Sequence, residues 1–147
     1  MISFRNGSFT FVLIIMTQNT SPKITSTVLE NGIVENYVPS RMLVDSDDLI
    51  KLKKNNQKLM GGNPYCVLLT GGRAIITKEA REMAAAQDFI QITIAMAIVV
   101  DTKWSRIFAN LYLRVNKPKM ETRIFEVREE AIEWLRLKLN KSEQNLG

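Results

Sequence analysis

The sequence contains no histidine and only one cysteine among its 147 residues. The absence of histidine excludes Ser-His-Asp and Cys-His catalysis, together with the zinc-binding helices that carry two histidines. A zinc site built from one cysteine and no histidine does not match the usual ligand sets. Cys66 lies in the apolar run Tyr65–Leu69, which favours a small buried side chain over a nucleophile. We therefore expect no enzymatic activity, no cofactor and no metal centre.

The chain also lacks an apolar segment long enough to cross a bilayer. The run Phe9–Met16 is followed by the polar segment Thr17–Pro22, an order that signal peptides share, but no Ala-x-Ala cleavage site follows. Three interpretations of residues 1–23 stay open: an over-long start upstream of a natural Met16, an ordered or partner-bound arm, and a targeting segment. Because nothing in the sequence requires an oxidising compartment, we expect a cytoplasmic protein with no membrane span.

Hydrophobic residues make up 46% of the chain and charged residues 24%, which is typical of a globular protein. The net charge of +5 is too small to indicate nucleic-acid binding, and we expect no nucleic-acid partner. The length fits one domain, which we place at residues 24–141. An N-terminal extension, 1–23, precedes this domain, and a tail, 142–147, follows it.

The first part of the domain has the pattern of a β-hairpin. Its two segments are rich in β-branched residues, and Asn31-Gly32 between them favours a type I′ turn. Strands and helices then alternate; Asp45 is suited to cap the first helix, and Thr77 lies directly before the second. The expected elements are strands at Ile24–Glu30, Ile33–Val38, Tyr65–Leu69, Ala95–Val100 and Arg123–Val127, and helices after Asp45, at Lys78–Ala86, at Thr102–Asn116 and from Arg128 onward.

This order, β-β-α-β-α-β-α-β-α, predicts an α/β fold with a mixed, mainly parallel five-stranded sheet and about four helices. Apolar residues at helical spacing define the side that each helix should bury. For the first helix they are Leu49, Leu52, Leu59 and Met60, and for the last they are Ala131, Trp134, Leu135 and Leu139. We predict that Trp134 anchors the core.

The segment Thr102–Asn116 carries a basic stripe opposite its apolar side. The stripe includes Lys103, Arg106 and Arg114, continues to Lys117, and has no acidic residue to balance it. A stripe of this kind is usually a solvated helix face. The alternative is a contact face for an acidic protein or for phosphate groups, and we take these four residues as candidate partner-binding residues.

The C-terminal half also resembles a group of short bacterial proteins with a SpoIIAA-like domain of the STAS or SEC14 type. The residues that carry this resemblance are Arg106, the turn Asn116-Lys117-Pro118, Arg123-Ile124-Phe125, and Ala131 followed by Trp134-Leu135. The resemblance implies a STAS-like fold over residues 24–140. It also implies a non-enzymatic protein-interaction or regulatory module, whose partner is another protein or a second copy of the chain.

Well-understood proteins with this fold exchange partners when a serine near the start of a helix is phosphorylated. The corresponding loop here is Thr70-Gly71-Gly72-Arg73, which contains no serine and no preceding aspartate. We take it as a candidate regulatory loop, with a plain turn as the alternative, because its glycines match no phosphate-binding motif. The lipid-carrier branch of the fold implies a second function, a small-ligand or lipid-binding domain of the SEC14-like type.

Overall fold

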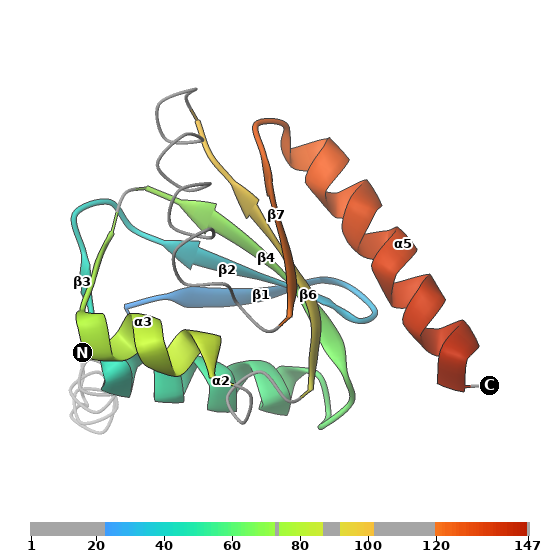
Figure 1. The fold of residues 1–147 in the computed structure, drawn as a ribbon, viewed down its shortest axis with the longest axis horizontal. Helices are drawn as coiled ribbons and strands as arrows, with labels where there is room; N and C mark the ends of the chain where they lie inside the picture. The colour runs from blue at the N-terminus through green and yellow to red at the C-terminus, as the bar shows by residue number, and fades with distance from the viewer. Residues whose placement is uncertain (1–22, 73, 87–91, 102–119, 147) are drawn as a thin grey trace, which may run out of the picture.

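A five-stranded sheet forms the centre of the computed structural model, which describes residues 23–72, 74–86, 92–101 and 120–146 (Figure 1). The strand order is β1-β2-β4-β6-β7, and only β1 and β2 are antiparallel. The strands are β1 (Thr25–Glu30), β2 (Ile33–Val38), β4 (Tyr65–Gly71), β6 (Thr93–Val99) and β7 (Glu121–Phe125). The predicted mixed, mainly parallel sheet is confirmed.

Three helices lie in the described part of the chain: α2 (Ser46–Leu59), α3 (Lys78–Ala85) and α5 (Arg128–Leu146). The helix predicted at 102–116 falls outside the described residues. Helix α5 continues to Leu146, through most of the segment expected to form a tail. Two short strands that the sequence did not reveal, β3 (Leu43–Val44) and β5 (Ile75–Ile76), pair in parallel as a second small sheet.

Local sequence signals set the boundaries of these elements. Gly32 has a φ of 88° in the turn between β1 and β2, a conformation that favours glycine. Asp45 and Asp48 form a capping box at the start of α2, with each side chain accepting a backbone N–H of the other residue at 2.9 Å. The Thr77 hydroxyl accepts the Ala80 N–H at the start of α3. The predicted hairpin and the predicted Asp45 cap are therefore confirmed. The predicted type I′ turn was wrong, because that turn requires a positive φ at both central residues and Asn31 does not have one.

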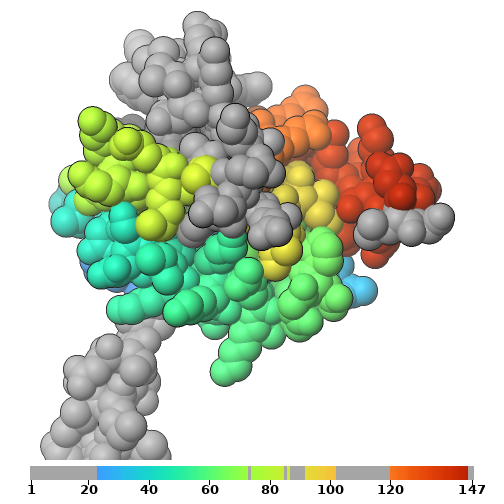
Figure 2. Space-filling model, turned by 60° about the horizontal axis from the view of Figure 1, so that its bottom comes forward, coloured from blue at the N-terminus to red at the C-terminus, as the bar shows by residue number. Residues whose placement is uncertain are grey.

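The helices divide between the two faces of the sheet. From β2 to β4 to β6 the chain steps in one direction across the sheet, and right-handed crossovers of this kind place their helices on the same face. Helices α2 and α3 lie side by side on that face, whereas α5 lies apart from them (Figures 1 and 2). Helix α5, which follows β7, packs on the opposite face against β4, β6 and β7.

The larger apolar core lies between the sheet and α5. Cys66, Leu68, Ala95 and Ala97 project from the strands toward the helix side chains, and Trp134 packs on Phe125 with ring centroids 5.6 Å apart. Trp134 is only 9% exposed, so its predicted place in the core is confirmed. Cys66 is fully buried, and burial raises the pKa of its thiol to about 12, which agrees with a packing role.

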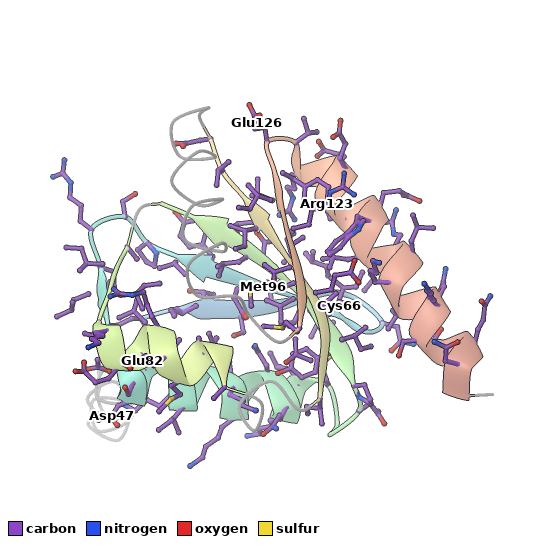
Figure 3. The ribbon with its side chains drawn as sticks, viewed as in Figure 1. Asp47, Cys66, Glu82, Met96, Arg123 and Glu126 are labelled. Atoms are coloured by element: carbon purple, nitrogen blue, oxygen red, sulfur yellow. The ribbon has the colours of Figure 1, made fainter. Side chains whose placement is uncertain are left out.

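The opposite core lies under α2 and α3 and contains one buried polar pair, Asn36 of β2 and Asn56 of α2, which hydrogen-bond to each other. Its apolar part includes Val34, Tyr65 and Val67, with Met96 packed against them; Figure 3 labels Met96 and Cys66, which belong to the cores on opposite faces. Leu49, Leu52 and Met60 are partly buried as predicted. The prediction for Leu59 was wrong, because its position at the end of α2 leaves it exposed.

Candidate functional site

The carboxyl half of β2 places polar side chains on the face that carries α5. Alternation along the strand directs Glu35 and Tyr37 to this face and Asn36 to the other. Tyr37 lies opposite Thr25 of β1 and Thr70 of β4, and Glu35 lies opposite Thr27. We call these five residues, Thr25, Thr27, Glu35, Tyr37 and Thr70, the open strip.

On this face α5 lies over β4, β6 and β7 and leaves Thr25, Thr27 and Tyr37 of the open strip exposed. The helix contacts β4, β6 and β7, and in Figure 1 it descends on the right while the β2 arrow points away from it. Thr25 and Thr27 are exposed, and Tyr37 keeps 49% of its surface exposed. The result is a flat area of hydroxyl groups around one aromatic ring, whose amphipathic side chain suits it to interfaces.

An ion pair between Glu35 and Arg128 lies at the end of the open strip nearest α5. Arg128, the first residue of that helix, donates from Nη1 to Glu35 Oε2 at 2.7 Å. The Thr70 hydroxyl donates to the same oxygen at 2.5 Å. Burial raises the pKa of Glu35, but the hydrogen bonds from Arg128 and Thr70 and the positive charge of Arg128 outweigh it, so the pKa lies below its ordinary value. Glu35 is therefore ionised at neutral pH and is a poor proton acceptor.

The loop after Thr70 is held by a close backbone contact. Gly71 has a φ of 117°, and a Cβ atom there would collide with the carbonyl oxygen of Val38. A Cβ atom at Gly72 would collide with the Ser40 side chain, and the Gly72 N–H donates to the Val38 carbonyl at 2.8 Å. Both glycines are thus needed for the loops after β2 and β4 to lie together, which supports a structural turn at this position.

Beyond these loops, the small β3–β5 sheet exposes two apolar side chains. Leu43 and Ile75 lie opposite each other in the strand register and are 51% and 64% exposed. Their neighbours Val44 and Ile76 turn inward and pack in the core beside α2. The segments that follow β2 and β4 along the chain therefore carry an exposed apolar pair, Leu43 and Ile75.

A small hollow among the described residues lies elsewhere, beside the start of β1. It is lined by Lys23, Ile24, Asp48, Lys51 and Leu52 and encloses about 10 Å³. A hollow of this size has room for about one water molecule at most. Within the described ranges, no group of three or more cysteine or carboxylate side chains is arranged to hold a metal ion.

Comparison with known proteins places these features in a family. The family model described as "domain of unknown function (DUF7793)" matches residues 27–138. The chain belongs to the DUF7793 family. The matched region contains four of the five residues of the open strip as well as Arg128. No curated protein matches the sequence.

The DUF7793 chain also has the fold of a solved structure. It is similar to an uncharacterized protein of the DUF3478 family with a SpoIIAA-like fold from Shewanella loihica PV-4, with a TM-score of 0.51 and 12% sequence identity. The match covers 76% of this chain and 91% of the other. The expected SpoIIAA-like fold is confirmed, and the likeness shows the fold alone. None of the helices in the described ranges has the length and apolar character needed to cross a membrane.

The predicted site residues fall into two groups. The structure brings Thr70, Gly71 and Gly72 together at the carboxyl end of β4. Arg73 and the basic residues Lys103, Arg106, Arg114 and Lys117 lie outside the described residues. Sequence reasoning missed Glu35, Tyr37 and Arg128. The available signal was the break in alternation along Ile33–Val38, where polar residues follow one another and one of them must face away from α2.

Proposed function

We propose that this DUF7793 protein is a non-enzymatic interaction or regulatory module that binds a protein partner over the open strip. The observation that carries the proposal is Tyr37, a half-exposed aromatic side chain among threonine hydroxyls on a sheet face that α5 leaves uncovered. Exposed aromatic residues of this kind often provide the largest contributions to protein–protein affinity.

The electrostatics of the open strip favour recognition over proton transfer. Glu35 is held by Arg128 and Thr70 with a lowered pKa, so its carboxylate presents a fixed charge beside the exposed hydroxyls. The chain offers no histidine that could move a proton near neutral pH. A partner with hydrogen-bonding groups and one apolar contact for Tyr37 fits this surface.

Affinity capture with the full-length protein tests the proposal, using extracts of the source organism and mass-spectrometric identification. The test variant is Tyr37→Asp, and the matched control is Leu137→Asp, because Leu137 is a large apolar residue that is 61% exposed on α5. For the purified partner we expect Tyr37→Asp to raise the Kd at least about tenfold, since loss of an aromatic contact typically costs more than 1 kcal/mol. Leu137→Asp should bind like the wild type.

Equal binding by the two variants would contradict the role of the open strip. Native mass spectrometry of freshly purified protein addresses the alternative, a small-ligand or lipid-binding domain of the SEC14-like type. A small molecule that remains bound at a fixed stoichiometry would favour that alternative. The hollow beside Lys23 gives it no support, because it holds about one water molecule.

A further inference from the structure

The two edges of the sheet differ in how they are protected. Exposed edge strands usually carry charges or proline, because their unpaired backbone groups would otherwise pair with another chain. Strand β7 carries Glu121 and Arg123. Strand β1, in contrast, reads Thr-Ser-Thr-Val-Leu before its terminal Glu30, and in the described structure it pairs with β2 alone. Its middle is β-branched, uncharged and free of proline.

The charged residues at the two ends of β1 are held by their own subunit. Lys23 donates to Asp48 Oδ2 at 3.1 Å and to the Leu43 carbonyl at 2.9 Å. Glu30 accepts two hydrogen bonds from Arg136, at 2.8 Å and 2.9 Å. These contacts direct both charges back toward the subunit, so neither lies across the edge. The side chains from Thr25 to Val28 are themselves uncharged, so within the described residues neither the strand nor the charges at its ends block the backbone groups of this outer edge.

We propose that β1 pairs antiparallel with β1 of a second copy of this chain, and that this pairing joins the two open strips into one surface. The proposal deepens the proposed function by naming a second copy as one partner and the β1 edge as its contact. The two copies are related by a two-fold axis normal to the sheet. Directly opposed residues of the two β1 strands must then point to the same face, so the axis passes through a residue and not between two residues. Within the regular stretch Thr25–Val28, this condition places either Ser26 or Thr27 on the axis.

Both registers produce favourable contacts across the axis. Each sets threonines opposite each other on the α5 face, as Thr27 with Thr27 or as Thr25 with Thr27, and such pairs are favourable across antiparallel strands. Val28, which is exposed on the other face, gains a neighbour from the second copy. The irregularity between Val28 and Glu30 lies at the hairpin end and leaves this stretch regular. The edge is thus complementary to itself.

The pairing changes the proposed binding surface. The strand order becomes β2-β1-β1-β2 across the axis. Because Tyr37 is in register with Thr25, the two copies of Tyr37 are then separated by about 14 Å across the strands and by about 7 Å or about 14 Å along them, depending on the register. Both α5 helices lie on this face, one on each side, so they flank a shared floor of threonine and tyrosine side chains. The open strip of one copy is therefore half of the surface that a further partner would contact. Because a strand edge is a small interface, we expect a reversible dimer in the micromolar range.

Sedimentation equilibrium of the full-length protein over a range of concentrations tests the pairing. Thr27→Lys and Thr27→Glu each place like charges near the axis and should raise the dimer Kd at least about tenfold, whereas an equimolar mixture should recover dimers through Lys–Glu pairs. Leu137→Lys is the control, because it adds the same charge at an exposed position on α5. Circular dichroism and melting of each variant establish that the subunit is folded.

Backbone hydrogen exchange provides a second readout. Those amides of residues 25–28 that point away from β2 should become more protected as the wild-type concentration rises, and Thr27→Lys should abolish that change. A monomer at all concentrations would overturn the proposal, and so would protection of these amides that is independent of concentration, which would mean that the edge is covered within one subunit. A dimer that survives Thr27→Lys would also overturn it. Loss of partner binding by Tyr37→Asp with the dimer intact would separate the two functions.

Discussion

Asn36 and Tyr37 are neighbours in β2, yet they lie in contrasting environments. Asn36 faces α2 and is 1% exposed, whereas Tyr37 faces the other side of the sheet and is 49% exposed. The Asn36 amide exchanges two hydrogen bonds with Asn56 of α2, at 2.9 Å and 3.0 Å, and it also donates to Ser26. In the strand register Tyr37 lies between Thr25 of β1 and Thr70 of β4.

This contrast separates polar groups that specify the fold from polar groups available for recognition. A buried amide must have its hydrogen bonds satisfied, and the paired asparagines achieve this only when α2 sits at one position along β2. The open strip has no such requirement, because water or a partner can satisfy its hydroxyl groups. The difference follows from coverage: α2 packs against β1 and reaches Asn36 of β2 through Asn56, whereas α5 covers the other face over β4, β6 and β7.

The largest loss of stability is expected from removing Trp134, which anchors α5 on the sheet. We expect Trp134→Ala to lower the free energy of unfolding by about 3–5 kcal/mol, because a buried aromatic side chain is lost and a cavity remains. The ring also contacts Phe125, and the Lys138 ammonium lies 5.4 Å from its centroid. Chemical denaturation provides the measurement. Leu137→Ala on the same helix is the control and should change stability by no more than about 0.5 kcal/mol, because Leu137 is exposed.

The next test concerns the face covered by α2. Asn56→Leu leaves the Asn36 amide oxygen buried without its partner, and we expect a loss of about 1–3 kcal/mol in the free energy of unfolding. Replacing both asparagines with leucine should cost less than the sum of the single changes, because neither amide is then stranded. A double-mutant cycle by chemical denaturation measures this coupling. Additive losses would mean that the pair does not act as a unit.

Local signals predicted most of the fold from the sequence. Asn31-Gly32, Asp45 and Thr77 act through backbone groups within a few residues, so their patterns can be recognised without tertiary structure. The strands β3 and β5 have two residues each, too few to show a period of two. Leu59 was misassigned because helical spacing alone does not reveal where the sheet stops covering a helix end.

The candidate site was harder to predict because its contacts join distant parts of the chain. Glu35 and Arg128 are 93 residues apart, and Asn36 and Asn56 are 20 apart. The first pairing depends on where α5 packs and the second on where α2 packs, and neither position is contained in a local sequence pattern. The position of Thr70 after a strand identified it as a candidate, but the sequence did not reveal that its hydroxyl donates to Glu35. The role of Gly71 as a close-contact residue likewise required the position of Val38.

The smallest expected effect concerns the ion pair between Glu35 of the open strip and Arg128 of α5. We expect Glu35→Gln to lower the free energy of unfolding at neutral pH by about 1 kcal/mol or less. The ion pair is partly solvated, since the Arg128 side chain is 39% exposed, and such pairs contribute little. Gln keeps the size of the side chain and removes the charge, so the change isolates the electrostatic contribution.

The pH dependence of that difference identifies its origin. The pKa of Glu35 in the folded protein lies below the ordinary value of 4.5, so folding favours the ionised form. The stabilisation is fully present above the unfolded pKa and is lost as the pH falls through the folded pKa. We therefore expect the gap between wild type and Glu35→Gln to be constant near neutral pH and to close below about 4.5. Glu30 and Asp48 also have lowered pKa values, but both proteins retain them, so their contributions cancel in the difference. Urea denaturation from pH 3 to 7 measures the gap; a gap that stays constant down to the lowest pH would mean that Arg128 does not stabilise the charge on Glu35.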